Sequence, residues 1–113
     1  MTLYSDLPVY KASYDLFVII FEYAKHFNKD YKYTIGEKLK NETIEMMLNI
    51  YRANINTDKK ELLQLARENI EVIRLLFRLL QDLKQITLEK FVIINQKIEN
   101  VSRQLVGWQK AQK

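Results

Sequence analysis

The stretch that decides the fold is Lys60–Gln85, which reads KELLQLARENIEVIRLLFRLLQDLKQ. At about 100° per residue in a helix, four cationic side chains of this stretch fall within roughly 40° of one another. They form a basic seam made of Lys60, Arg67, Arg74 and Arg78. Apolar side chains sweep about 240° of the remaining circumference, well beyond the ~100° stripe that one core requires. The pattern therefore predicts a helix that buries one face in its own core and another against a second copy of the chain.

The composition indicates that the whole chain is built in this way. The 113 residues include two Gly and one Pro, which leaves little material for strands joined by tight turns or for phosphate-binding loops. The length predicts a single domain over residues 1–113. Hydrophobic periodicity indicates four helices of about 20 residues joined by short loops, and short loops make neighbouring helices antiparallel. We expect an all-α, up-down-up-down antiparallel four-helix bundle.

The ends of the first two helices are marked by local signals. The first helix follows Pro8 and keeps an apolar face as far as Phe27, before the polar break at residues 28–30. The second opens at Thr34, whose hydroxyl is expected to cap the amide of Glu37 while the Glu37 carboxylate reaches back. It is expected to run to about Asn56.

The last two helices have similar signals. Thr57 and Asp58 are expected to cap the third helix and to place negative charge at its positive end. Thr87 is expected to cap the fourth helix, which runs to Gly107 and the lysine-rich end. Trp108 falls in line with the apolar face of this helix, so we expect it to be buried.

The first helix also has more apolar side chains than one core needs. Because the first and third helices both show this surplus, the sequence predicts a ring or barrel whose subunits bury these faces against each other. The predicted interface residues are Tyr14, Phe17, Val18, Phe21, Leu63, Ile70 and Phe77.

Charge and hydropathy restrict the compartment and the partners. The formal net charge is +4 and the pI is near 9.2, which permits binding to a polyanion without requiring it. The chain has no Cys, which excludes disulfides and suits a reducing compartment. The longest apolar run is far shorter than the ~20 residues of a membrane span, and the first 11 residues lack the features of a signal peptide. We therefore expect a cytoplasmic protein without membrane contact.

Catalytic chemistry has little support. The only histidine, His26, lies one turn after Glu22, and one such pair cannot form a di-metal site in a bundle core. No Ser or Thr has a histidine base nearby in sequence, so no nucleophile can be assigned. The sequence predicts no catalytic residues, no metal, no cofactor and no small-molecule substrate.

Two longer motifs resemble a known family. They are YTIGEKLKNETIEMMLNIYRA (residues 33–53) and ENIEVIRLLFRLLQDLKQITLEKFVIINQKIENVSRQLVGWQK (residues 68–110). The chain resembles the accessory variability determinant family of diversity-generating retroelements, which is related to the four-helix proteins encoded in ribosomal RNA intervening sequences. The most specific pieces are the Tyr-Thr-Ile-Gly opening, the stretch of the third helix from Ile73 to Leu83, and the closing Gly107-Trp108. The family often has a second Gly where this chain has Val106. The resemblance implies a homopentameric barrel that is the non-enzymatic partner of a reverse transcriptase.

The spacing of the basic residues also favours nucleic-acid binding. A rigid helix that presents guanidinium groups one or two turns apart can neutralise several phosphates without reading bases. The alternative is an ordinary salt-bridged face, because Glu71 and Asp82 lie three or four residues from seam arginines. A second basic pair, Arg103 and Lys110, is expected on the outer face of the fourth helix, where plain solvation is the competing interpretation.

A further basic cluster lies near the end of the first helix. Lys25, Lys29 and Lys32 accompany His26 there, and they can be explained as the positive complement of a negative helix end.

The predicted function is that of a non-enzymatic accessory protein in a diversity-generating retroelement. It would bind RNA or an RNA–DNA intermediate through Lys60, Arg67, Arg74, Arg78, Arg103 and Lys110, and it would partner a reverse transcriptase in mutagenic retrohoming. Two alternatives stay open. One is an RNA-associated bundle protein of the ribosomal RNA intervening-sequence type, and the other is an oligomeric helical scaffold that binds only protein.

Overall fold

The computed structural model describes residues 3–112, and these residues form helices and short loops without a strand. The four long helices are α1 (Pro8–Ala24), α3 (Ile35–Ile55), α4 (Lys60–Asp82) and α5 (Leu88–Lys110). Two short elements accompany them, the 3-10 helix η1 (Tyr4–Asp6) and the single-turn helix α2 (Lys29–Lys32). The predicted all-α class is confirmed.

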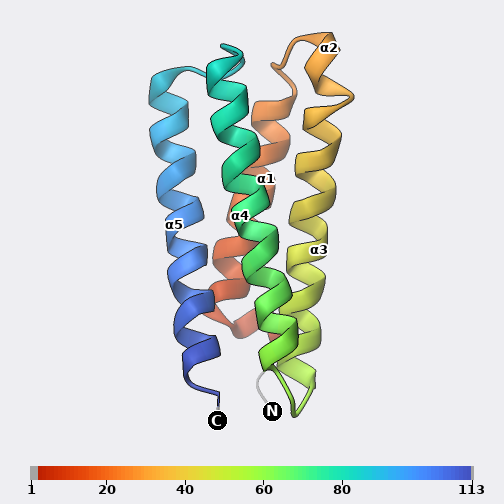
Figure 1. Ribbon diagram of the computed structural model, residues 1–113, viewed down its shortest axis with the longest axis vertical. Coiled ribbons are helices and arrows are strands. Elements are labelled where there is room, and N and C mark those ends of the chain that lie inside the picture. Colours follow the sequence, from red (N-terminus) through yellow and green to blue (C-terminus); the bar gives the residue numbers. More distant parts are fainter. Residues whose placement is uncertain (1–2, 113) are drawn as a thin grey trace.

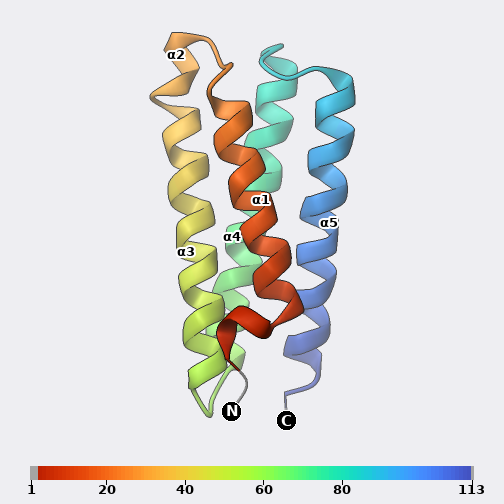
Figure 2. The same ribbon diagram turned by 180° about the vertical axis from the view of Figure 1, so that it is seen from behind.

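The molecule measures 43 × 22 × 21 Å along its principal axes. The long helices lie side by side along its longest axis (Figure 1). The α1–α3 and α4–α5 connections lie at one end, and the α3–α4 connection lies at the other (Figures 1 and 2). Packing contacts join α1 to α3, α3 to α4, α4 to α5 and α5 to α1. The bundle therefore has four sides, and α1 lies diagonally across from α4.

Apolar side chains from all four long helices form the core between them. Leu16 of α1, Met46 of α3, Ile73 of α4 and Ile98 of α5 are fully buried there. The buried hydroxyls of Ser13 and Thr43 donate to the carbonyl oxygens four residues earlier, each at 2.7 Å, and each hydroxyl thereby meets its hydrogen-bonding need within its own helix.

One part of the predicted subunit interface is wrong. Leu63, Ile70 and Phe77 of α4 are fully buried in the core of the single chain, so they have no surface to offer a second copy. The apolar side chains that α4 exposes are others. Leu65 and Leu79 are each 42% exposed and Leu75 is 66% exposed.

The expected capping box at Thr34 is also wrong. The Thr34 hydroxyl donates to the carbonyl oxygen of Asp30 at 2.9 Å instead of accepting from Glu37. The reason is the preceding helical turn: α2 brings the carbonyl of Asp30 close and gives Thr34 φ and ψ angles of −117° and −86°, whereas a capping residue is usually extended. The polar break thus contains a short helix, and α1 ends at Ala24, one turn before Phe27.

The start of α4 differs from the prediction in a similar way. The residue before α4 is Lys59, and neither Thr57 nor Asp58 caps the helix. Lys59 stabilises the end of α3 instead, because its ammonium donates to the carbonyl oxygens of Ala53 at 2.7 Å and Asn56 at 2.5 Å. A cation at a helix C-terminus also complements the helix dipole.

The predicted cap of the last helix is confirmed. The amide of Lys90 donates to the Thr87 hydroxyl at 3.2 Å. The helix continues through Gly107 to Lys110. Trp108 packs against the core, on the face that the sequence indicated, but it is only half-buried.

Candidate nucleic-acid interface

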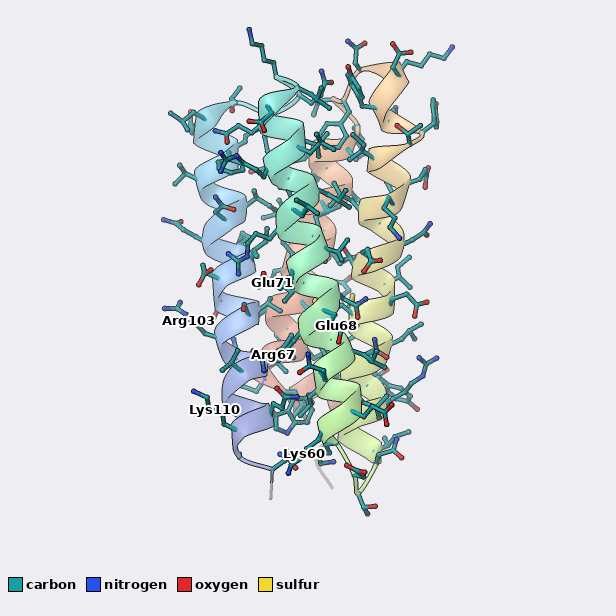
Figure 3. The ribbon with its side chains drawn as sticks, in the orientation of Figure 1. Lys60, Arg67, Glu68, Glu71, Arg103 and Lys110 are labelled. Carbon is teal, nitrogen blue, oxygen red and sulfur yellow. The ribbon has the colours of Figure 1, made fainter. Side chains whose placement is uncertain are left out.

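The basic seam of α4 faces α5, and polar side chains bridge the two helices (Figure 3). Arg67 donates to the side-chain oxygen of Gln109 on α5. The amide nitrogen of Gln109 in turn donates to the backbone oxygen of Lys60 at 3.2 Å and to the side chain of Gln64 at 3.1 Å. Gln109 therefore fixes Arg67 in position without neutralising its charge.

Arg74 has a different environment. Its Nε lies 3.1 Å from a Glu71 carboxylate oxygen, and its Nη1 lies 2.5 Å from a carboxylate oxygen of Glu99 on α5. Partial burial lowers the pKa of Arg74, but hydrogen bonds and attraction from both carboxylates outweigh it and raise the pKa above the ordinary arginine value. Arg74 therefore stays protonated while two acids offset its charge.

The charge of Arg78 is offset by an acid more than that of Arg67 and less than that of Arg74. Its Nε lies 3.7 Å from a carboxylate oxygen of Asp82, and both side chains are largely exposed, at 71% and 64%. A pair of this kind is weak in water. Arg78 also lines a hollow of about 640 Å³ between α4 and α5, together with Arg74 and Phe91.

The remaining predicted cations lie toward the end of the bundle that holds the α3–α4 connection. Lys60, Arg103 and Lys110 are exposed, and no described carboxylate forms an ion pair with any of them or with Arg67. Figure 3 shows Arg103 and Lys110 extending from the outer side of α5, while Arg67 lies between α4 and α5. We call these four residues the open basic set: Lys60, Arg67, Arg103 and Lys110.

The helical pattern alone missed this division of the α4–α5 face. Helix α4 contains four cations and four acids, so its net charge is zero. The acid that distinguishes Arg74 from Arg67 is on another helix, Glu99 of α5, and contacts between helices are not visible in the periodicity of one helix.

Predicted interface residues gather on the opposite side of the bundle, between α1 and α3. Tyr14 is 50% exposed and Val18 is 43% exposed. Phe17 and Phe21 are half-buried and contact each other, with ring centroids 4.4 Å apart. A hollow of about 480 Å³ opens beside Phe17. Its other lining residues are Tyr4, Tyr10, Ile44, Met47, Leu48 and Tyr51.

The contribution of α3 to this side was not predicted. Ile44, Leu48 and Tyr51 are each partly exposed, at 38–39%. At about 100° per residue they lie within roughly 60° of one another, so a search for a second apolar face on this helix could have found them.

His26 is exposed, and residues 3–112 contain no group of three or more His, Cys, Asp or Glu side chains arranged to hold a metal ion. Within the same residues no helix combines the length and hydropathy needed to cross a membrane.

These observations define an all-helical protein with cations on the α4–α5 side and apolar side chains on the α1–α3 side. A model of the bAvd-like family matches residues 9–112, and the chain belongs to this family. Proteins of this family are accessory proteins associated with diversity-generating retroelements. The comparison with curated proteins gives no match.

Proposed function

We propose that this protein binds RNA or an RNA–DNA intermediate through its α4–α5 side and acts as partner of a reverse transcriptase in mutagenic retrohoming. The observation that carries the proposal is the open basic set, four cations without an ion-paired carboxylate on one side of a rigid bundle. Cations placed in this way attract phosphates whatever the base sequence. Membership in the bAvd-like family supports the retroelement context.

Binding can be tested by fluorescence anisotropy with labelled RNA and RNA–DNA probes of unrelated sequence. We expect similar affinities for all probes and a steep decrease with salt, because each neutralised phosphate releases counterions. The slope of the logarithm of the binding constant against the logarithm of the salt concentration is called the salt slope. Replacing all four residues of the open basic set by Ala should reduce its magnitude by about 3. A matched control replaces Lys11, Lys38, Lys40 and Arg52, four cations of α1 and α3, by Ala. Salt-independent binding, or an equal effect of the control, would contradict the proposal.

We also propose that the protein assembles into a ring, a homopentamer by the family resemblance, in the cytoplasm. The connections between the long helices alternate between the two ends of the bundle in Figures 1 and 2, which supports the up-down-up-down antiparallel arrangement. In this arrangement each side of the bundle is formed either by two helices that are consecutive in the sequence or by the first and last long helices. A ring requires two different patches on each subunit. The first patch is the α1–α3 side, represented by Tyr14 and Val18.

The second patch is a stripe of α4 made of Leu65, Val72 and Leu79. These residues are spaced by seven, and Leu65 lies about 160° around the helix from Arg67. Leu65 and Leu79 are each 42% exposed. Leu65 and Leu79 thus lie away from the basic seam, whereas Val72 borders a hollow that Arg67 also lines. The stripe replaces the buried α4 residues that the sequence had suggested.

Light scattering tests the ring and both patches together. Each of the variants Tyr14→Glu/Val18→Glu and Leu65→Glu/Leu79→Glu should have a lower mass in solution than the wild-type assembly. Mixed together, they should form a heterodimer, because each variant keeps the patch that the other has lost. Val92→Glu on α5, where Val92 is 48% exposed, is the control and should assemble fully. A wild-type monomer would refute the ring.

Two alternatives remain distinguishable from this proposal. A protein of the ribosomal RNA intervening-sequence type should bind RNA but not a purified reverse transcriptase, and its gene should lie without an adjacent reverse-transcriptase gene. A scaffold that binds only protein should assemble but fail to bind any nucleic-acid probe at low salt.

A further inference from the structure

Positive charge is concentrated at the end of the bundle where α1 and α4 end and α3 and α5 begin (Figures 1 and 2). Residues 25–34 and 83–87 contain four lysines and one aspartate, a net charge of +3, while the whole chain carries +4. We call this region the lysine end, after Lys25, Lys29, Lys32 and Lys84. Lys25 pairs with Glu22 at 3.2 Å, and the other three have no ion pair among the described residues.

The two loops that carry these lysines are held together. The backbone amide of Asn28 donates to the Gln85 side chain at 2.7 Å, which joins the loop after α1 to the loop after α4 across the diagonal of the bundle. Phe27 and Ile86, which adjoin the two bonded residues in the chain, are buried. Lys29 follows Asn28 in the chain, and Lys84 precedes Gln85. The hydrogen bond therefore holds the backbones of the two lysines close together before any ligand binds.

Lys84 occupies an unusual backbone conformation. Its φ is 59°, in the left-handed region, where Gly is favoured because it has no Cβ. The amide of Lys84 donates to the carbonyl of Gln81 at 3.0 Å, and the amide of Gln85 donates to that of Leu80 at 2.9 Å. These two bonds form a Schellman motif, whose left-handed position is usually Gly. A lysine at a position that favours Gly is a backbone outlier, and its side chain is therefore a candidate for a function.

An exposed aromatic ring lies beside the lysines. Tyr33 is 62% exposed, and the Lys32 ammonium lies 5.9 Å from the centre of its ring. Proteins that bind single strands combine cations for the backbone with exposed aromatic rings on which bases stack. A duplex offers no such base, because its bases are already stacked on each other.

We propose that the lysine end binds single-stranded nucleic acid, with Lys29, Lys32 and Lys84 at the phosphates and Tyr33 stacked on a base. This inference rests on the proposed nucleic-acid function and adds a second contact region. The lysine end and Lys60 lie at opposite ends of a bundle 43 Å long, so one strand that contacts both would follow the length of the molecule.

The test uses the full chain and a labelled oligouridylate of about 15 nucleotides, within the site sizes of single-strand binders. The variant Lys29→Ala/Lys32→Ala/Lys84→Gly should bind at least about tenfold more weakly, and its salt slope should be smaller by about 2, because about 0.7 counterion is released per phosphate of a single strand. Tyr33→Ala should also weaken binding about tenfold, while Tyr33→Phe should bind like the wild type, because Phe can still stack.

Lys84→Gly alone separates binding from folding. This change removes a cation and also relieves the left-handed conformation, so the melting temperature should rise while the affinity falls. If the variant lost affinity because it misfolded, the melting temperature would fall together with the affinity. Lys11→Ala is the matched control, since Lys11 is exposed on α1 and its loss removes the same charge elsewhere.

Each possible result has a defined meaning. If the lysine-end variant binds like the wild type while substitution of the open basic set weakens binding, this inference is wrong and the proposed function stands. If the wild type binds neither this probe nor the RNA and RNA–DNA probes at low salt, both are wrong. Equal losses in Lys11→Ala and Lys84→Gly, or wild-type binding by Tyr33→Ala, also overturn the inference.

Discussion

Removing two carboxylates should strengthen nucleic-acid binding if the α4–α5 side is the interface. In the variant Glu71→Gln/Glu99→Gln, Arg74 loses the two acids that lie 3.1 and 2.5 Å from its guanidinium. Arg74 is 32% exposed, so a phosphate can reach it once the acids are gone. The variant thus adds one usable cation beside Arg67 and Arg78.

The size of the effect follows from counterion release. One additional phosphate contact steepens the dependence of affinity on salt by about 0.7 to 0.9 in log–log slope, which corresponds to about five- to eightfold tighter binding near 0.1 M salt. Arginine stays protonated in this range with or without the two acids, so the gain should be constant between about pH 6 and 9. The two carboxylates are about half exposed, so the loss of their ion pairs should cost below about 1.5 kcal/mol of folding stability in total.

Anisotropy titrations at several salt concentrations measure both quantities, and thermal unfolding measures the stability. The matched control is Asp15→Asn/Glu45→Gln, which removes two exposed acids from α1 and α3. Unchanged or weaker binding in Glu71→Gln/Glu99→Gln would refute the reasoning, because Arg74 and its two acids would then be a structural network only. An equal gain in the control would show that net charge, and not this face, determines affinity.

Three further predictions concern stability, measured by denaturant unfolding. Trp108→Ala should cost about 2 kcal/mol, less than the 3 to about 5 kcal/mol of a fully buried Trp, because Trp108 is half-buried at the edge of the core; a cost near zero would place it outside the packed structure. Gly107→Ala should stabilise by about 0.5–1 kcal/mol, because an added Cβ meets nothing within 4 Å, and a loss of stability or of assembly would reveal a close partner at this position. Lys59→Met should destabilise by about 1–2 kcal/mol, because the α3 carbonyls lose a charged donor, and a neutral effect would show that water replaces it.

The elements that depend on local periodicity were predictable from the sequence. The four helices lie where hydrophobic repeats indicated them, since a repeat near 3.6 residues reports directly on the buried face of a helix. Thr87 was predicted correctly as a cap because its partner, the amide of Lys90, is three residues away. At Thr34 the short helix α2 was not visible in the pattern, and it gave the hydroxyl another partner.

The candidate site was less predictable, because its chemistry depends on contacts between helices. The basic seam was visible as a stripe, but the difference between Arg67, held by Gln109, and Arg74, neutralised by Glu99, comes from α5. The apolar surplus of α4 was also visible, yet the sequence could not show which of its apolar residues faced the core. Leu63, Ile70 and Phe77 do.

The two proposed patches also restrict the kind of ring that can form. In a closed ring of n subunits the two interfaces of one subunit point in directions that differ by 180° − 360°/n, which is about 90° for four members, 108° for five and 120° for six. One patch lies on the α1–α3 side, and the other lies on α4 away from α5, so they belong to adjacent sides of a four-sided bundle. Adjacent sides differ by roughly a quarter turn, which fits four or five members better than a larger ring. The same arrangement leaves α5 and its side of α4 uncovered. A ring built in this way would present the open basic set of every subunit on its accessible surface, where one strand could contact several subunits at once.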